Sequence, residues 1–181
     1  PTVTEGGNLN YTVTLSNAST TPTIVTLTPA SGTGTLGTDT GTPIQVSFDG
    51  GTTFTTVTGP TVSVPAGTTS FITRIPTTND TISEPSETIL LSASTPRNTA
   101  PVQGTGTITD NDTPNITIND VTRNEGAGTI TFTVSLTIPS SSTITVDYAA
   151  VSGTATLGTD ITAGNRPLSG TVTFDPNQIT Q

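Results

Sequence analysis

Apolar and polar residues alternate in short runs along almost the whole chain. In the first run, Leu9, Tyr11, Val13 and Leu15 are separated by asparagine and threonine. A period of two places alternate side chains on opposite faces of an extended strand. The pattern therefore predicts short β-strands and no helix of ordinary length. Further runs of this kind lie at 24–27, 44–48, 62–64, 71–75, 89–91, 105–108, 116–118, 130–136, 144–148 and 172–174.

Clusters of glycine, proline, asparagine and aspartate separate these runs, as in PASGTG, FDGGTTF and VPAGTT. Threonine is abundant in the runs themselves, and its branched side chain suits a half-buried pleated surface. Closely spaced short strands with turn signals between them are typical of β-sandwiches. We therefore expect an all-β protein built of antiparallel β-sandwiches in tandem.

An internal repeat divides the chain. SGTGTLGTD at 31–39 recurs as SGTATLGTD at 152–160, an offset of 121 residues (152 minus 31). The same offset pairs Leu9 to Leu15 of EGGNLNYTVTLS (5–16) with Ile130 to Leu136 of EGAGTITFTVSL (125–136). TVSVPAGTT at 61–69 aligns with TVTFDPNQI at 171–179 at an offset of 110 (171 minus 61). Such self-similarity marks repeated structural units. We predict a first, nearly complete repeat at 1–112 and the N-terminal half of a second repeat at 113–181.

The alignment also shows what each repeat lacks. Residues 115–120 (NITIND) supply a strand ahead of Glu125 that has no counterpart ahead of Glu5, and the second repeat stops before any counterpart of 70–112. Both ends are therefore expected to cut through a sandwich. The missing strands would come from a longer chain of such repeats or from identical neighbouring subunits by strand addition.

The composition argues against an enzyme. The chain has no cysteine or histidine, and all four of its basic residues are arginines. Serine–histidine, cysteine–histidine and lysine Schiff-base chemistries are therefore absent. A glycosidase pair at Glu84 and Glu87 is disfavoured, because strand residues at odd separation face opposite sides and no aromatic sugar platform accompanies them.

The charge balance points to cations as partners. Thirteen acidic residues against four basic ones give a net charge of −9. Nucleic acid is an unsuitable partner for such a surface, since phosphate binding needs clustered positive charge. No apolar run approaches the roughly 20 residues of a membrane helix, so we expect no membrane insertion.

Carboxylates of the first repeat fall at strand ends in four places: Glu5, Asp39, Asp80 with Glu84, and Asp110 with Asp112. Loops from alternate strand ends gather at one pole of a sandwich, where these charges would repel one another. Calcium neutralises such a cluster well, because it takes six to eight oxygen ligands in flexible geometry. The alternative is that these residues only favour turns, with Asp39 capping its own loop.

Five ordered motifs resemble one known family. EGG (5–7), SGTGTLGTD (31–39), VSVPAGTT (62–69), NDTISEPSET (79–88) and GTITDND (106–112) are similar to the Calx-beta repeat. This family includes regulatory domains of sodium–calcium exchangers and repeats of large bacterial and cyanobacterial surface proteins. The resemblance covers the first repeat and the available half of the second. It implies an immunoglobulin-like sandwich with a calcium cluster at one end.

The resemblance also implies a set of ligands for Ca²⁺. Glu87 is a weaker candidate, because it begins a strand. Asn79 replaces one of two adjacent aspartates common in the family, and the loss of a carboxylate should lower the affinity for Ca²⁺. Thr40 and Ile161 stand where the family often has an aromatic residue. The implied ligands are Glu5, Asp39, Asp80, Glu84, Asp110 and Asp112 in the first repeat and Glu125 and Asp160 in the second.

These features lead to a structural hypothesis for function. We expect a repeat segment of a secreted, cell-surface adhesin, stalk or filament, stiffened by calcium where one repeat joins the next at 110–112. Its partners would be neighbouring repeats of the same chain or identical subunits in a fibre, with surface glycans as further candidates. The alternatives are a module that binds glycans or ice through Thr-x-Thr arrays, and a calcium-sensing regulatory domain.

Overall fold

The computed structural model describes residues 1–98, 100–164 and 167–181. These residues form thirteen β-strands, β1 to β13, and one short 3₁₀ helix, with no α-helix among them. They divide into two compact units. Unit 1 comprises residues 1–80 and 85–111, and unit 2 comprises residues 81–84 and 112–181. The repeat boundary at 112/113 remains a prediction from the sequence.

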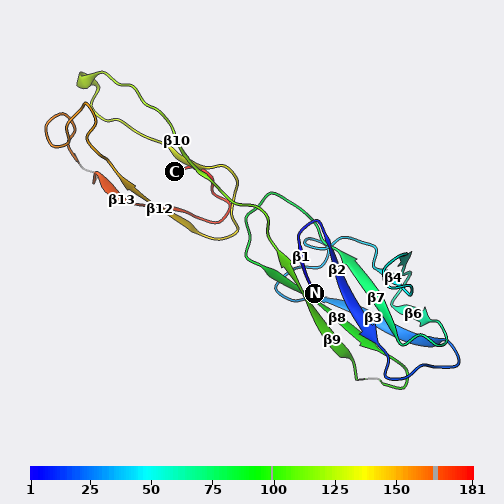
Figure 1. The fold of residues 1–181 in the computed structure, drawn as a ribbon. Helices are drawn as coiled ribbons and strands as arrows, with labels where there is room; N and C mark the ends of the chain where they lie inside the picture. Colours follow the sequence, from blue (N-terminus) through cyan, green and yellow to red (C-terminus); the bar gives the residue numbers. More distant parts are fainter. Residues whose placement is uncertain (99, 165–166) are drawn as a thin grey trace. The chain divides into compact units, whose positions relative to one another are not determined.

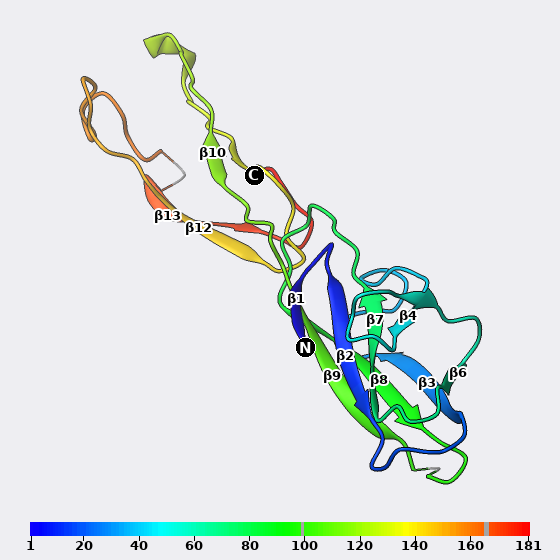
Figure 2. The same ribbon diagram turned by 45° about the vertical axis from the view of Figure 1, so that its right-hand side comes forward.

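Unit 1 is a sandwich of two β-sheets, as the alternation predicted (Figures 1 and 2). Its strands are antiparallel except for β1, which pairs parallel with β9. The strand at 2–4 was not expected, since it is too short to show a period. The five-stranded sheet has the order β1 (Thr2–Thr4), β9 (Val102–Thr109), β8 (Glu87–Ser94), β3 (Thr23–Ser31) and β6 (Thr61–Val64). The four-stranded sheet has the order β2 (Asn8–Thr14), β7 (Ser70–Pro76), β4 (Gln45–Ser47) and β5 (Thr55–Thr56).

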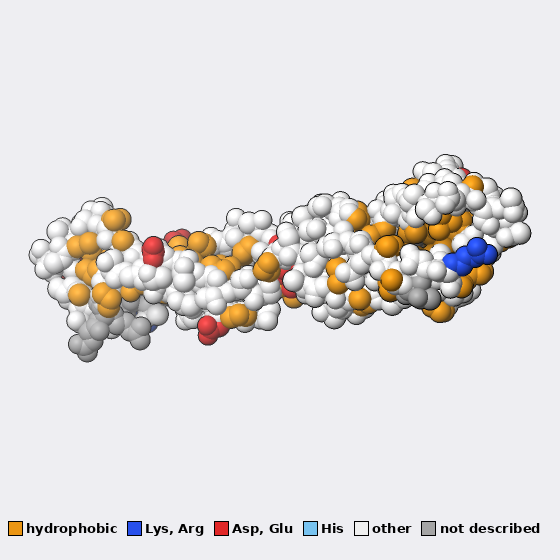
Figure 3. Space-filling model, turned by 90° about the horizontal axis from the view of Figure 1, so that it is seen from below, with side chains coloured by type: hydrophobic (Ala, Val, Ile, Leu, Met, Phe, Trp, Pro, Cys, Tyr) orange, Lys and Arg blue, Asp and Glu red, His pale blue; other side chains and the backbone are white. Residues whose placement is uncertain are grey.

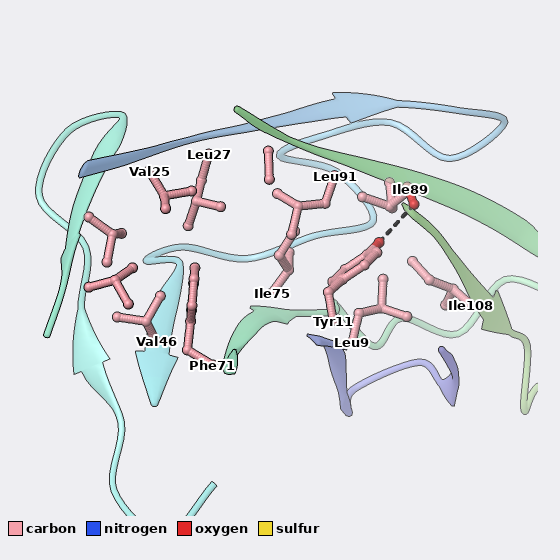
Figure 4. Close-up of a cluster of buried hydrophobic side chains, with 13 residues drawn as sticks. Leu9, Tyr11, Val25, Leu27, Val46, Phe71, Ile75, Ile89, Leu91 and Ile108 are labelled. Atoms are coloured by element: carbon pink, nitrogen blue, oxygen red, sulfur yellow. Dashed lines mark hydrogen bonds between the residues drawn. The ribbon is translucent and has the colours of Figure 1, made fainter. Parts of the chain in front are cut away.

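The core of unit 1 lies between these sheets, where the apolar positions of each alternating strand meet (Figure 4). Threonine and serine fill many of the outward positions of these strands. On the face drawn in Figure 3, most of the surface carries neither apolar nor charged side chains. The buried apolar side chains are Leu9, Tyr11, Val25, Leu27, Val46, Val62, Val64, Phe71, Ile75, Ile89, Leu91, Ala93 and Ile108.

Tyr11 joins the two sheets. It extends from β2 across the core, and its hydroxyl donates a hydrogen bond of 2.7 Å to the carbonyl oxygen of Ile89 on β8 (Figure 4). Gly106 on β9 makes room for it, because a Cβ atom at this position would lie 2.4 Å from the Tyr11 hydroxyl oxygen. The buried polar group thus has a partner, as a buried hydroxyl requires.

Unit 2 consists of two antiparallel pairs of strands. β10 (Ile116–Ile118) pairs with β11 (Val134–Leu136), and β12 (Ile144–Ala149) pairs with β13 (Ser169–Phe174). The 3₁₀ helix η1 spans Glu125–Ala127. The segment 81–84 belongs to this unit: the Ser83 amide donates to the Pro139 carbonyl at 3.0 Å, and the Ser141 amide donates to the Ser83 carbonyl at 3.0 Å.

The described part of unit 2 buries far fewer apolar side chains than unit 1 does. Leu136 and Phe174 are buried, whereas Ile130 and Phe132 are 41% and 53% exposed. The strand expected over 130–136 begins only at Val134. Its counterpart β2 pairs with β7 over its whole length, and the described part of unit 2 holds no counterpart of β7. The prediction of an all-β fold of antiparallel β-sandwiches is confirmed.

No helix in the described residues is both long and apolar enough to span a membrane.

Candidate metal centre

A first group of carboxylates comprises Glu5, Asp80 and Asp112. These residues follow β1, β7 and β9, and one carboxylate oxygen from each lies within 4.8 Å of the others. All three were predicted as ligands from the sequence. The structure therefore brings together three predicted residues that are up to 107 positions apart (112 minus 5).

Backbone hydrogen bonds hold the loops of this first group in place. The Glu5 amide donates to the Thr109 carbonyl at 3.0 Å, and the Gly6 amide donates to the Thr78 carbonyl at 3.2 Å. The Asn111 side-chain amide also donates to the Asn79 side-chain oxygen at 3.1 Å. The ends of β1, β7 and β9 are thus tied to one another independently of the carboxylates.

Two oxygens of the first group are shielded from water, Oε1 of Glu5 and Oδ2 of Asp112, whereas the Asp80 side chain is exposed. Carboxylates held this close repel one another more strongly where water is excluded, because the effective dielectric constant falls. A cation placed among them would relieve that repulsion.

A second group comprises Asp39, Glu84 and Glu87, all half-buried, again with carboxylate oxygens within 4.8 Å of one another. Asp39 and Glu87 belong to unit 1, and Glu84 belongs to the segment 81–84. Glu87 on β8 is the register partner of Ile108 on β9, two residues before Asp110. The Thr78 amide also donates to the Asp39 carbonyl at 3.0 Å, which joins the loop that carries Asp39 to the segment before Asp80.

Glu87 lies in the second group, although the sequence made it only a weaker candidate. The argument that Glu84 and Glu87 face opposite sides of a strand is wrong, because Glu84 lies outside β8, which begins at Glu87. The parity rule applies only within a strand. The spacing of two acidic residues around Pro85 and Ser86 could have suggested a turn that brings the carboxylates together.

Asp39 also has a structural role, and its counterpart in the second repeat shares it. The Thr35 amide donates to Oδ2 of Asp39, and the Thr156 amide donates to Oδ2 of Asp160 at 2.8 Å. Gly37 and Gly158 adopt the same left-handed conformation, with φ of +87° and +90°. Both nonapeptides therefore fold into one kind of aspartate-capped loop, as the alternative interpretation of Asp39 proposed.

The one difference between the nonapeptides follows from packing. A Cβ atom at Gly34 would lie 3.2 Å from the Glu87 side chain and 3.3 Å from that of Ile89, which is a crowded position. Its counterpart Ala155 is exposed. A side chain is therefore tolerated in the second copy, whereas in the first copy it would press on a member of the carboxylate group.

The remaining predicted ligands lie in neither group within the described ranges. Asp110 follows directly after β9, Glu125 begins η1, and Asp160 caps its own loop. Among the described residues, none of these three belongs to a group of three closely spaced carboxylates. They stay predictions from the sequence.

The donor chemistry of the two groups fits calcium. Every candidate ligand is a carboxylate oxygen, and the chain has neither histidine nor cysteine for softer metals. Hard divalent cations prefer such oxygens, and calcium tolerates the irregular geometry of loops at strand ends better than magnesium does.

The sequence matches a known protein family. A family model, the Calx-beta domain, matches residues 3–122 and 109–181. The chain belongs to the Calx-beta family. The ordered motifs of the first repeat and the half-repeat after it are therefore Calx-beta sequences, as their resemblance implied.

Two solved structures are similar to this Calx-beta chain. The crystal structure of CBD12 from CALX1.2 is 21% identical, with a TM-score of 0.47, and the match covers 99% of this chain and 69% of that one. The crystal structure of calcium binding domain CBD12 of CALX1.1 is 18% identical, with a TM-score of 0.48 and coverages of 100% and 69%. No curated protein matches the chain.

Proposed function

We propose that this Calx-beta chain binds Ca²⁺ at the end of unit 1 where β1, β7 and β9 end. The observation that carries the proposal is the convergence of Glu5, Asp80 and Asp112, with their carboxylate oxygens within 4.8 Å of one another. Asp39, Glu84 and Glu87 would hold a second ion nearby. The CALX1.1 structure is described as a calcium binding domain, but the proposal does not depend on that similarity.

Calcium would act here as a structural clamp. An ion held by the first group would cross-link the segments that follow three different strands, and it would hold the chain at 110–112 where it leaves β9. In an extracellular stalk or filament, this clamp would stiffen each joint between successive repeats. The partners in such an assembly are neighbouring repeats of the same chain or identical subunits.

Thermal unfolding in calcium and in chelator tests the binding. Extracellular calcium modules bind with Kd of roughly 0.1–1 mM, so about 10 mM Ca²⁺ should stabilise unit 1 by about 1.4–2.7 kcal/mol. For a domain of this size, we expect the Tm to rise by about 5–15 °C. Equal Mg²⁺ should raise it less, because magnesium demands regular octahedral geometry.

Matched variants locate the effect. Asp80→Asn removes an exposed member of the first group and should abolish most of the calcium-dependent rise in Tm. Asp120→Asn, also exposed but outside both groups, should retain it. An identical response of both variants would contradict the proposed site.

Backbone relaxation measurements test the clamp separately from binding. Chelation should lower the NMR order parameters of residues 110–112, while those of the core strands β7 and β8 stay unchanged. Order parameters that do not respond to calcium, in a protein whose Tm does respond, would refute stiffening and leave binding intact.

A further inference from the structure

Arg74 lies on the outer face of the four-stranded sheet of unit 1. Its neighbours in β7, Thr73 and Ile75, are buried, so the alternation of the strand directs Arg74 away from the core. The register places Gln45 of β4 on one side of Arg74 and Asn10 of β2 on the other. The cation is therefore flanked across the sheet by two neutral amide side chains.

Two contacts orient the guanidinium group of Arg74. Its Nε donates a hydrogen bond to Oε1 of Gln45 at 3.0 Å, and Nη2 donates to the same oxygen. The guanidinium carbon lies 3.6 Å from the centre of the Phe54 ring, which makes a cation–π contact. A long side chain ordinarily loses conformational entropy when it binds a ligand, and these contacts already restrict it. The cation is thus oriented before any ligand arrives.

The part of the guanidinium that Gln45 leaves open suits a carboxylate. Among the residues that the structure describes, Gln45 is the only hydrogen-bond partner of Arg74, and no carboxylate pairs with it. Arg74 is half-buried, and its Nη1 is accessible to solvent. An arginine has five N–H donors, so Nη1 and the second N–H of Nη2 remain. Two such neighbouring N–H groups match the two oxygens of a carboxylate.

The segment that supplies Gln45 and Phe54 is an insertion in the first repeat. Across this segment the offset between the repeats falls from 121 to 110, so the first repeat has 11 additional residues here (121 minus 110). Both β4 and β5 lie in that interval, whereas the described part of the second repeat holds no strand between Asp160 and Ser169. The second repeat keeps the flanking motifs without this hairpin. The hairpin therefore adds the partners of Arg74 to a repeat that forms its flanking motifs without them.

A turn closed by its own hydrogen bonds holds Phe54 in place. The two carboxylate oxygens of Asp49 accept from the Thr53 amide at 2.9 and 3.0 Å. Gly51 has a φ of +94°, and a Cβ atom there would lie 3.3 Å from the Ile72 side chain and 3.9 Å from the Phe54 ring. The turn thus packs closely onto β7 beside Arg74. It fixes the aromatic ring without help from a ligand.

We propose that Arg74 binds the carboxylate of an acidic sugar, a uronic acid, on this face of unit 1. The carboxylate would accept from Nη1 and Nη2, and the amide groups of Gln45 and Asn10 would exchange hydrogen bonds with sugar hydroxyls. One cation suits a glycan with a single isolated carboxylate, because the net charge of −9 repels dense polyanions. A peptide strand is a poorer occupant, since β7 is paired along both edges and offers no ladder for strand addition.

This site goes beyond the proposed calcium clamp and does not depend on it. It shares no residue with either group of carboxylates. The binding of an acidic sugar should therefore be the same in calcium and in EDTA, and its failure would leave the calcium proposal untouched.

NMR titration of the ¹⁵N-labelled full chain with methyl glucuronide tests the inference. Saturable shifts are expected in the backbone amides of Gln45, Phe54 and Arg74 and in the Arg74 Nε–H signal, with a Kd of about 1–10 mM. Methyl glucoside, which lacks the carboxylate, should cause no such shifts at the same concentrations. Acetate should bind at least about 10-fold more weakly, because it lacks the hydroxyls. Equal shifts with the glucoside, or equal affinity for acetate, would overturn the inference.

Variants locate the site and separate its charge from its geometry. Arg74→Lys keeps the charge but loses the planar fork, so it should weaken glucuronide binding at least about five-fold, and Arg74→Gln should abolish it. Phe54→Leu removes the cation–π contact and should weaken binding by about two- to five-fold. Arg123→Gln, which removes an exposed arginine of unit 2, is the matched control and should bind as the wild type does. Unchanged binding in Arg74→Gln, or equal loss in Arg123→Gln, would overturn the inference.

Discussion

Tyr11 places a titratable phenol inside an apolar core. Its side chain is 4% exposed, and burial raises its pKa to about 12, although a backbone hydrogen bond from Gly106 opposes part of that rise. The neutral form is thus favoured in the folded state, since burial penalises the charged phenolate. The ordinary value of 10.0 applies to the unfolded chain.

This shift predicts a loss of stability at alkaline pH. Above pH 10 the unfolded chain releases the Tyr11 proton while the folded chain retains it, so the free energy of unfolding falls until about pH 12. The slope should be about 1.4 kcal/mol per pH unit, and the stabilisation is fully present below pH 10. Urea unfolding at a series of pH values measures it.

Tyr11→Phe should flatten this slope, at a cost of about 1 kcal/mol at neutral pH for the hydrogen bond to Ile89. Tyr148→Phe, in unit 2, is the matched control and should leave the slope of unit 1 unchanged. A slope that survives in Tyr11→Phe would assign the effect to another group.

The sequence predicted part of this arrangement. The alternation from Leu9 to Leu15 identified Tyr11 as an inward residue, because a period of two fixes which face it occupies. The bond to Ile89 spans 78 positions and depends on how two sheets pack, which no local pattern specifies. Gly106 likewise owes its identity to a neighbour distant in sequence.

At the scale of elements, the two nonapeptide loops form a natural pair of test and control. Both have the aspartate cap, but only the loop at 31–39 has Glu84 and Glu87 beside its aspartate in the described residues. The repeat in the sequence predicted the shared loop. It could not predict the different surroundings, because these come from β8 and the segment before it.

Calcium should therefore affect one loop and leave the other unchanged. Titration of Ca²⁺ into ¹⁵N-labelled protein should shift the amide signals of residues 31–39 and 84–88, whereas those of residues 152–160 should stay in place. Asp39→Asn should abolish these shifts, and Asp160→Asn should not alter them. Equal shifts in both loops would mean that a lone capped aspartate suffices, which would contradict the grouped site.

For the whole molecule, the distribution of buried apolar side chains differs between the units. Thirteen residues form the cluster of unit 1, whereas the buried apolar side chains described in unit 2 are Leu136 and Phe174. Apolar burial supplies most of the free energy that opposes chain entropy. Unit 2 should therefore be the less stable part.

Native-state hydrogen exchange tests this difference. Amides of β3, β7 and β8 should exchange through opening of unit 1 as a whole, and amides of β12 and β13 should exchange at least 100-fold faster, by local opening. Equal protection in both units would show that unit 2 gains stability from contacts other than its own core.

The central claim is that the two groups of carboxylates, Glu5 with Asp80 and Asp112 and Asp39 with Glu84 and Glu87, bind calcium. Isothermal titration calorimetry of Ca²⁺ into the chelator-treated full chain measures this most directly. The account predicts saturable binding with a Kd of roughly 0.1–1 mM. Binding should be lost from the first group in the double variant Asp80→Asn with Asp112→Asn and kept in Asp120→Asn. Absence of saturable binding up to about 10 mM Ca²⁺, or unchanged binding by the double variant, would contradict the account.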